Sequence, residues 1–343
     1  MSEKKELPDG TTTVTHQPAV GFFEEIWLRI CAFMYRYLCE IIFVRFRMQD
    51  RKFWALQKPD KTVSYSARPM LRHRVFIPAN HREGQKHAVY LLIHGVGFII
   101  GTPQMDDAQA RFLADQHNYV VVAIGYRRAP EHRYPTAIFD AAAVIDAVLN
   151  DTTLPIDNKK VVLGGFSAGA TIVLALAQLP ELQGRIKALV PFQPLTDQSC
   201  QVRGTYREQM PWGGGDDMSK TRTLSDWAFP PAGQDLRDRL ISPYHATRAN
   251  IPQPVCIITG SADMLCQEEY LLAAKLADRK ADSNFEKSWE QNGVKYWCAT
   301  DMPHGFTHFW VVIKGEEWRA KQLRAQKEAW QEVTTWLSRT LKG

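Results

Sequence analysis

The sequence feature that most constrains the fold is G-F-S-A-G at residues 165–169. A β-branched, apolar run over residues 161–163 precedes it, and a helix-forming run over residues 170–179 follows at once. This order predicts a strand, a very tight turn and a helix, in which strained backbone angles lift the hydroxyl of Ser167 off the end of the strand. Residues 165 and 169 nearly touch in such a turn, so glycine is required at both. The alternative for this motif alone is an ordinary serine in a glycine-punctuated turn.

Further apolar runs indicate an α/β fold class. They lack the polar alternation of a half-exposed strand, so both faces of each strand are expected to be buried. Helical patterns separate them, which predicts a mostly parallel central sheet with helices on both faces. Strands are expected at residues 72–77, 89–93, 120–126, 161–166, 187–191, 255–260 and 295–299, and helices at 108–116, 137–150, 170–179, 268–279 and 317–341.

Composition and charge exclude several ligands. Of the 343 residues, 45% are hydrophobic and 23% are charged, as in ordinary globular proteins. The net charge of +5 is scattered, so no nucleic-acid partner is expected. The six cysteines form no C-x-x-C pair and are expected to be free thiols in a reducing, cytoplasmic compartment. Neither a nucleotide-binding glycine motif nor a metal-ligand spacing is present, so we predict no cofactor and no metal.

The N-terminal part of the chain is predicted to contain neither a secretory signal nor a membrane span. Residues 1–17 are polar and lead into no apolar segment with a cleavage site, so no secretory signal is expected. Residues 21–48 are the most apolar long stretch, but charged side chains interrupt it and no integral membrane span is expected. The pattern favours an amphipathic helix packed on the protein over a membrane-surface anchor. A homodimer is compatible with the sequence, which does not fix the oligomeric state.

An activated serine needs a base, and the base needs a carboxylate that orients it. His304 follows the last expected strand, and Asp263 follows the strand before it. The carboxyl ends of parallel strands meet at one edge of a sheet, so both side chains are expected at the edge where Ser167 lies. We therefore predict a catalytic triad of Ser167, His304 and Asp263.

Three other residues fit these roles less well. His308 comes four residues after His304 and is expected in a helix. His245 lies in an irregular region at about 198–245. Asp301 is too near His304 in sequence to come from a separate loop.

Backbone N–H groups that could hold an oxyanion are expected from two places. Ala168 directly follows Ser167, so its N–H points at the same spot as the serine hydroxyl. H-G-V-G-F at residues 94–98 follows a strand and is rich in glycine, so its backbone N–H groups can crowd an oxyanion. The alternative is a simple glycine-rich turn.

Four motifs, taken in order, resemble those of the hormone-sensitive-lipase-like branch of the α/β-hydrolase superfamily (α/β-hydrolase fold-3). They are H-G-V-G-F at 94–98, Y-R-R-A-P-E-H at 126–132 with Pro135 and Asp140, G-F-S-A-G at 165–169, and D-M-L at 263–265 with H-G-F at 304–306. The match covers about residues 70–340, and the set is specific although each motif alone is not. The resemblance implies an α/β-hydrolase fold with a helical cap and a carboxylesterase activity on small acyl esters.

The same resemblance suggests how the chain divides. Residues 1–18 are predicted to be disordered, and residues 19–60 to form N-terminal cap helices. Residues 61–343 are predicted to form the α/β-hydrolase catalytic domain, with a cap insertion at about 198–245. Charged residues 279–292 are expected to be a surface insertion.

Carried over from the family, Ser167 is the nucleophile, His304 the base and acid, and Asp263 the orienting carboxylate. The oxyanion donors are the N–H groups of Val96, Gly97 and Ala168. The sequence departs from the family at Val96, where the middle glycine is replaced by a β-branched residue that adds bulk beside the acyl carbon.

Aromatic residues of the cap and near His304 predict that the partner is a small hydrophobic ester. Phe98, Trp212, Trp227 and Phe306 are the predicted substrate-binding residues, and core packing is the alternative for each of them. Two other functions stay open. The same triad could perform acyl transfer, lactonisation or another non-hydrolytic step in specialised-metabolite biosynthesis, or the fold could serve as a non-catalytic small-molecule receptor.

Overall fold

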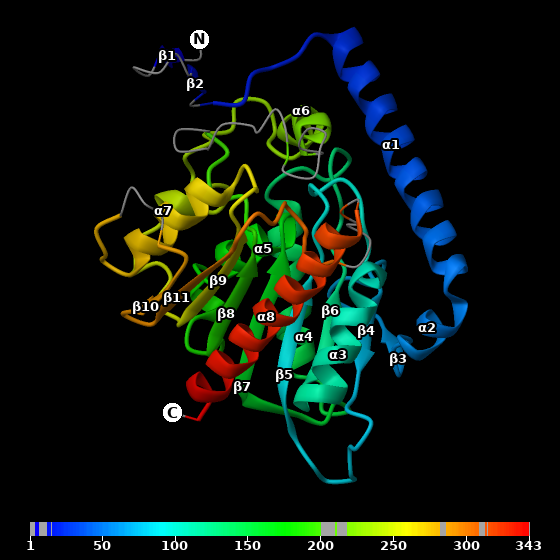
Figure 1. Cartoon of the computed structure of the whole chain (residues 1–343). Helices are drawn as coiled ribbons and strands as arrows, with labels where there is room; N and C mark the ends of the chain where they lie inside the picture. The colour runs from blue at the N-terminus through cyan, green and yellow to red at the C-terminus, as the bar shows by residue number, and fades with distance from the viewer. Residues whose placement is uncertain are drawn as a thin grey trace.

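The computed structural model describes residues 4–6, 12–14, 16–199, 210, 218–281, 286–308, 313 and 315–342. Its main strands are β3 (Lys61–Val63), β4 (His73–Phe76), β5 (His87–Ile93), β6 (Val120–Ile124), β7 (Ile156–Phe166), β8 (Ala188–Phe192), β9 (Val255–Gly260), β10 (Ser288–Gln291) and β11 (Val294–Ala299). They form one sheet in the order β10-β11-β9-β8-β7-β5-β6-β4-β3 (Figure 1). From β11 to β6 the neighbouring strands are parallel, whereas β10 and β4 run antiparallel to the strands they join at the two sides.

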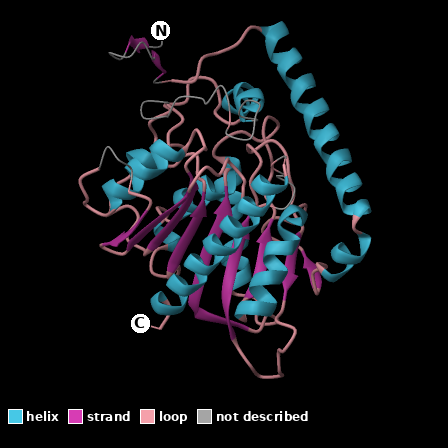
Figure 2. Ribbon diagram, in the orientation of Figure 1, coloured by secondary structure: helices cyan, strands magenta, loops and turns pink. Residues whose placement is uncertain are grey.

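Helices cover both faces of this sheet (Figure 2). One face packs on α3 (Asp107–His117) and α8 (Glu316–Thr340), and the other on α4 (Thr136–Leu149), α5 (Ala168–Leu176) and α7 (Cys266–Leu276). Successive side chains of a strand point to opposite faces, so Leu91 belongs to one apolar cluster and Leu92 to the other. This double burial explains the continuous apolar runs and confirms the predicted α/β fold class.

Further helices lie over the carboxyl ends of the strands and along one side of the molecule. They are α1 (Phe22–Gln49), α2 (Arg51–Leu56) and α6 (Met218–Ala228). Helix α1 packs against α6, and their contact belongs to a third apolar cluster, which includes Ala32, Ile100 and Trp227. Within the described residues, no helix combines the length and the apolar character that a membrane span requires.

The structure differs from the expectation in four segments. Residues 288–291 form β10 and pair with β11, where a surface insertion was expected. Strand β3 was not predicted, and β7 begins five positions before the expected 161. In the predicted disordered segment, β1 (Lys4–Glu6) and β2 (Thr12–Val14) pair antiparallel, and the other residues before 16 lie outside the described residues.

Candidate active site

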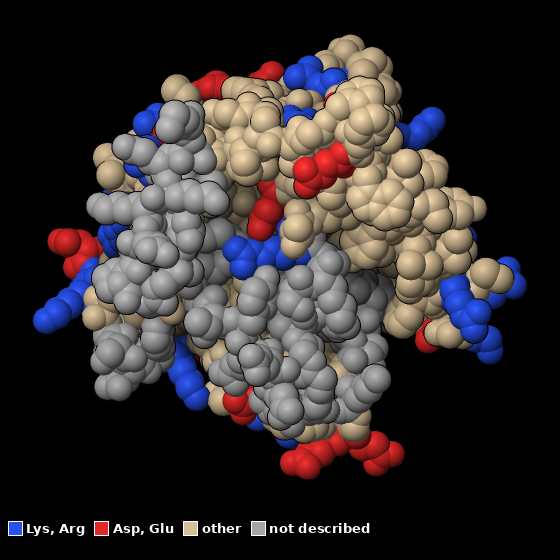
Figure 3. All heavy atoms as spheres, turned by 90° about the horizontal axis from the view of Figure 1, so that it is seen from above, with Lys and Arg blue, Asp and Glu red and all other residues tan. Residues whose placement is uncertain are grey.

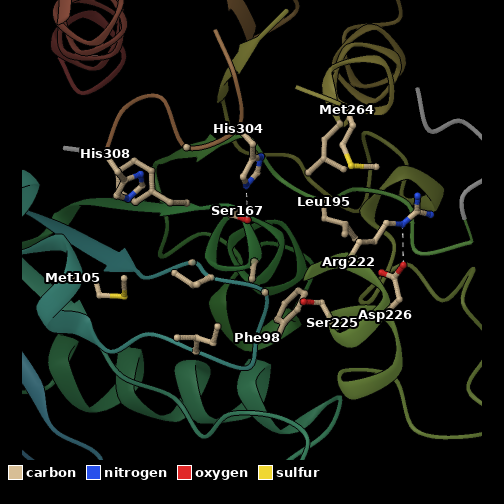
Figure 4. Close-up of a pocket in the computed structure, with 18 of the residues that line it drawn as sticks. Phe98, Met105, Ser167, Leu195, Arg222, Ser225, Asp226, Met264, His304 and His308 are labelled. Atoms are coloured by element: carbon tan, nitrogen blue, oxygen red, sulfur yellow. Dashed lines mark hydrogen bonds and ion pairs between the residues drawn. The ribbon is translucent and has the colours of Figure 1, made fainter. Parts of the chain in front are cut away.

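The side chains of Ser167, His304 and Asp263 form one hydrogen-bonded chain. His304 Nε2 lies 2.8 Å from Ser167 Oγ (Figure 4), and His304 Nδ1 lies 2.7 Å from Asp263 Oδ2. Ser167 follows β7, Asp263 follows β9 and His304 follows β11, so three parallel strands deliver the three side chains to one edge. With Nδ1–H donating to the carboxylate, Nε2 is the nitrogen that accepts the serine proton.

The turn that carries Ser167 has the strained geometry that its glycines require. Ser167 adopts φ 51° and ψ −121°, outside the regions that an L-residue normally occupies. A Cβ at Gly165 would lie 2.7 Å from the backbone of Gly169, and a Cβ at Gly169 would collide with the carbonyl of Ile93. The chain can therefore turn from β7 into α5 within one residue, and that residue is the serine.

Gln193 completes the support of this chain, and sequence reasoning missed it. Its Nε2 donates to Asp263 Oδ2 at 2.8 Å and to the Pro303 carbonyl at 3.1 Å, while its Oε1 accepts from the Gly305 N–H at 2.7 Å. One amide therefore ties the Asp263 loop to the His304 loop. The available signal was its position, because Gln193 is the first polar residue after the apolar β8, at the same edge as Ser167.

A cavity of about 200 Å³ opens beside Ser167 and His304. Val96, Gly97 and Ala168, the predicted oxyanion donors, all line it. Its walls are mostly apolar, and α1 contributes Tyr35 to them. Helix α6 contributes Arg222, Ser225 and Asp226 (Figure 4), of which Arg222 and Asp226 form an ion pair. Other lining residues are Phe98, Ile100, Met105, Leu195 and Met264.

The loop with the predicted oxyanion donors has an unusual backbone. Val96, Gly97 and Phe98 all adopt positive φ, at 73°, 62° and 64°. A Cβ at Gly95 would lie 2.5 Å from the Phe166 carbonyl, so this loop lies directly against the serine turn. Three successive left-handed residues turn the chain sharply at the wall of the cavity, and two of them are not glycine.

The Y-R-R-A-P-E-H segment holds this loop in place. The Tyr126 hydroxyl donates to the His94 carbonyl at 3.1 Å, and the Tyr126 and His94 rings stack 4.3 Å apart. Ala129 N–H donates to the Phe98 carbonyl at 3.0 Å, and Arg128 donates to the Gly101 carbonyl at 3.0 Å. Complete burial lowers the pKa of His94 to about 3, so this imidazole stays neutral. The motif therefore fixes the backbone of residues 94–101 through these hydrogen bonds and this ring stack.

The predicted substrate-binding residues separate into three groups. Phe98 lines the cavity and stacks on Phe229 with ring centroids 3.6 Å apart. Trp227 and Phe306 lie away from the cavity wall: Trp227 packs under Arg133 and donates to Glu25, and Phe306 is fully buried against the face of the sheet that α8 covers. Trp212 lies outside the described residues.

The alternative residues have other partners. His308 lies at a bend after the turn of residues 304–307 instead of in the expected helix, and its Nε2 is 3.3 Å from Asp106 Oδ1. Asp301 accepts from Lys321 at 2.7 Å, and His245 lies 3.7 Å from Asp197. Among the described residues, no group of three His, Cys, Asp or Glu side chains is placed to hold a metal ion.

The layered sheet and the serine at a strand-to-helix turn define the class of α/β hydrolases. A family model described as the alpha/beta hydrolase fold matches residues 90–308. The chain therefore belongs to the α/β-hydrolase fold-3 family, as its four motifs suggested.

Relatives of the chain carry the names of hydrolases, among them several esterases. An acetyl-hydrolase of Streptomyces hygroscopicus is 28% identical over 63% of this chain and 70% of its own length. An arylesterase of Saccharolobus solfataricus is 29% identical over 54% of this chain and 60% of its own length. The crystal structure of a hyperthermophilic esterase from the archaeon Pyrobaculum calidifontis has a TM-score of 0.67 and 22% identity, and the match covers 94% of this chain and 99% of that one. That structure confirms the fold.

Proposed function

We propose that this chain is a serine hydrolase that cleaves a carboxylic ester of a small hydrophobic molecule through an acyl-enzyme. The observation that carries the proposal is the hydrogen-bonded chain from Ser167 through His304 to Asp263 at the wall of a mostly apolar cavity. Family membership and the names of the relatives support ester hydrolysis as the reaction class.

In the proposed mechanism, Ser167 Oγ attacks the ester carbonyl carbon while His304 Nε2 takes the hydroxyl proton. Asp263 stabilises the imidazolium through Nδ1–H, and Gln193 holds the carboxylate in line. The backbone N–H groups of the oxyanion loop and of the residue after the serine stabilise the negative oxygen. The alcohol leaves with the proton from His304, and water then repeats the cycle on the acyl-enzyme.

Turnover of p-nitrophenyl esters from acetate to octanoate tests this proposal. We expect Ser167→Ala to lower kcat by at least about 10³-fold, because the nucleophile is lost. Ser338→Ala, on the outer surface of α8, is the matched control and should keep full activity. A phosphonate ester should also label the wild type once and leave Ser167→Ala unlabelled.

The same experiment distinguishes the other functions. A receptor would bind esters with no turnover that depends on Ser167, which would refute the hydrolase proposal. An acyltransferase would give a new ester in place of the free acid when an alcohol acceptor is present, so products are analysed with and without acceptor.

A further inference from the structure

The outer face of α1 carries a long apolar seam that nothing in the described part of the chain covers. Large apolar side chains recur at positions 23, 27, 30, 34, 37, 41, 44 and 48, and each is 48–84% exposed. Helix α1 lies along one margin of the molecule with no labelled element outside it (Figure 1). Seen from above, this side is mostly free of charged side chains (Figure 3). The seam therefore faces outward from the molecule.

The spacing of the seam indicates that its partner is a helix. The steps alternate between four and three residues, which is the 3.5-residue repeat of two helices that pack knobs into holes. The repeat runs from Phe23 to Met48, about 39 Å of helix. Five more large apolar residues of α1 are exposed beside the seam, at positions 22, 26, 33, 38 and 42. Positions 26, 33 and 38 flank the seam directly, where a paired helix would also cover them. A lipid surface selects a broad apolar face but does not require the alternation within the seam, so that alternation favours a second helix over a membrane.

We propose that this helix is α1 of a second copy of the chain, packed antiparallel across a two-fold axis. In such a pair, residues whose numbers add to 71 face each other: Met34 faces Tyr37, Ile30 faces Ile41, Trp27 faces Val44, and Phe23 faces Met48. Every seam residue then meets another seam residue. The seam is therefore self-complementary, as a two-fold interface must be. This proposal stands independently of the catalytic one.

Charges at the two ends of α1 select the antiparallel direction. Glu24 and Arg45 are exposed, lie on the same flank of the seam, and form no ion pair within the described residues. An antiparallel pair brings Glu24 of each copy beside Arg45 of the other, which makes two opposite-charge contacts. In a parallel pair, Glu24 of one copy would lie about 31 Å along the helix from Arg45 of the other, so neither opposite-charge contact would form.

The size of the seam matches the requirement of a dimer. Eight half-exposed large side chains present roughly 800 Å², close to the share of each partner in a standard interface. The largest apolar patch on a typical monomer covers about 300–600 Å². Leaving this area in water in a single copy would be unfavourable, and pairing two copies of α1 buries it.

Sedimentation velocity of the full chain over a range of micromolar concentrations tests the pairing. We expect the wild type to be a dimer, and Ile30→Glu and Ile41→Glu to be monomers with unchanged circular dichroism. Leu323→Glu, at an exposed leucine of α8, is the matched control and should stay dimeric. Glu24→Arg and Arg45→Glu should each raise the dimer Kd about tenfold, and the double variant should restore it.

Each other outcome overturns a stated part of the proposal. A monomeric wild type at all concentrations refutes the pairing, and so does a dimer that Ile30→Glu leaves intact. A double charge variant no tighter than the single ones refutes the antiparallel direction. A monomeric wild type that binds phosphatidylglycerol vesicles, and loses that binding with Ile30→Glu, assigns the face to lipid instead.

Discussion

Val96 shows how a strained residue can be maintained at the wall of the cavity. A β-branched side chain at φ 73° costs about 1–3 kcal/mol of backbone strain. Its side chain packs against the apolar cluster of the cap, which also contacts Tyr35 and Leu224. Packing against the cap therefore offsets the strain, and it places an isopropyl group at the cavity wall where the family has glycine.

Val96→Gly should broaden the acyl specificity of the proposed esterase. We expect kcat/KM for the octanoate ester, relative to the acetate ester, to rise about tenfold because the cavity gains the volume of the side chain. The loss of backbone strain stabilises the variant, whereas the lost packing and the greater flexibility of glycine in the unfolded chain destabilise it. The free energy of unfolding should therefore change by less than about 1 kcal/mol. Val96→Ala is the matched control: it removes the two γ-methyl groups but keeps Cβ and the cost of the positive φ, so it should broaden specificity less than Val96→Gly and destabilise more. An unchanged ratio in both variants would show that Val96 does not border the acyl group.

His73, on β4, should make folding stability fall in mild acid. Its buried Nδ1 accepts the Gly125 N–H at 3.2 Å, which requires a neutral ring, and burial lowers its pKa to about 4. From about pH 6.5 down to about 4, the unfolded chain binds a proton that the folded chain does not, so the free energy of unfolding falls by up to about 1.4 kcal/mol per pH unit. Urea unfolding across this window should show a shallower pH slope for His73→Gln. Equal slopes for variant and wild type would contradict this assignment.

At the scale of elements, α1 reaches the proposed oxyanion loop through its inner face. Arg36 donates to the Ile99 carbonyl at 2.9 Å and to the Ala129 carbonyl at 2.8 Å, and it pairs with Glu131 at 2.8 Å. One guanidinium therefore joins the cap helix, the loop that follows β5 and the Y-R-R-A-P-E-H segment.

Arg36→Gln should lower kcat about tenfold with a smaller change in KM, because the loop with the proposed oxyanion donors loses support. Arg36→Lys keeps the charge but cannot bridge both carbonyls, so an intermediate kcat is expected. Arg29→Gln removes an exposed ion pair with Glu25 from the same helix and is the matched control. Steady-state kinetics on p-nitrophenyl acetate measure all three. An effect of Arg29→Gln as large as that of Arg36→Gln would indicate general loosening of α1 instead.

Elements that are buried on both faces could be predicted from the sequence, whereas those that depend on distant partners could not. Residues 255–260 were predicted as a strand and form β9 with the same bounds, because every side chain in that run is buried. Strand β10 was missed because only Trp289 in it is buried, which leaves no apolar run to detect.

The triad side chains could be predicted from the sequence to lie together, because each follows a parallel strand. The position of Gln193 after β8 indicates the right edge of the sheet, but its contacts with the Asp263 and His304 loops could not be predicted, because both loops lie far along the chain. Trp227 and Phe306 show that an aromatic residue near a motif does not reveal which way its ring points.

At the scale of the whole molecule, the buried apolar side chains form two tiers of packing, which are the two large clusters on the sheet and one small cluster under the cap. The two clusters on the faces of the sheet contain most of the buried apolar side chains, and each joins strands to long helices. The cluster under the cap is much smaller and is built from α1, α6 and two loops. Opening the cap therefore exposes far less apolar surface than unfolding the sheet, so the two tiers should differ in their free energy of opening.

Hydrogen exchange followed by mass spectrometry should resolve these two tiers of packing and test whether the proposed cap, residues 19–60 with the insertion at about 198–245, opens separately from the sheet. We expect amides of α1 and α6 to exchange through openings of low free energy that denaturant barely changes, and amides of β5 and β7 to exchange only through global unfolding. The measurement belongs on Ile30→Glu, because pairing between copies would protect α1 in the wild type. If the amides of α1 and β7 share one opening free energy, the cap and the sheet form a single cooperative unit. Packing on Val96 and the contacts of Arg36 would then couple the cap to the sheet more tightly than their small buried area predicts.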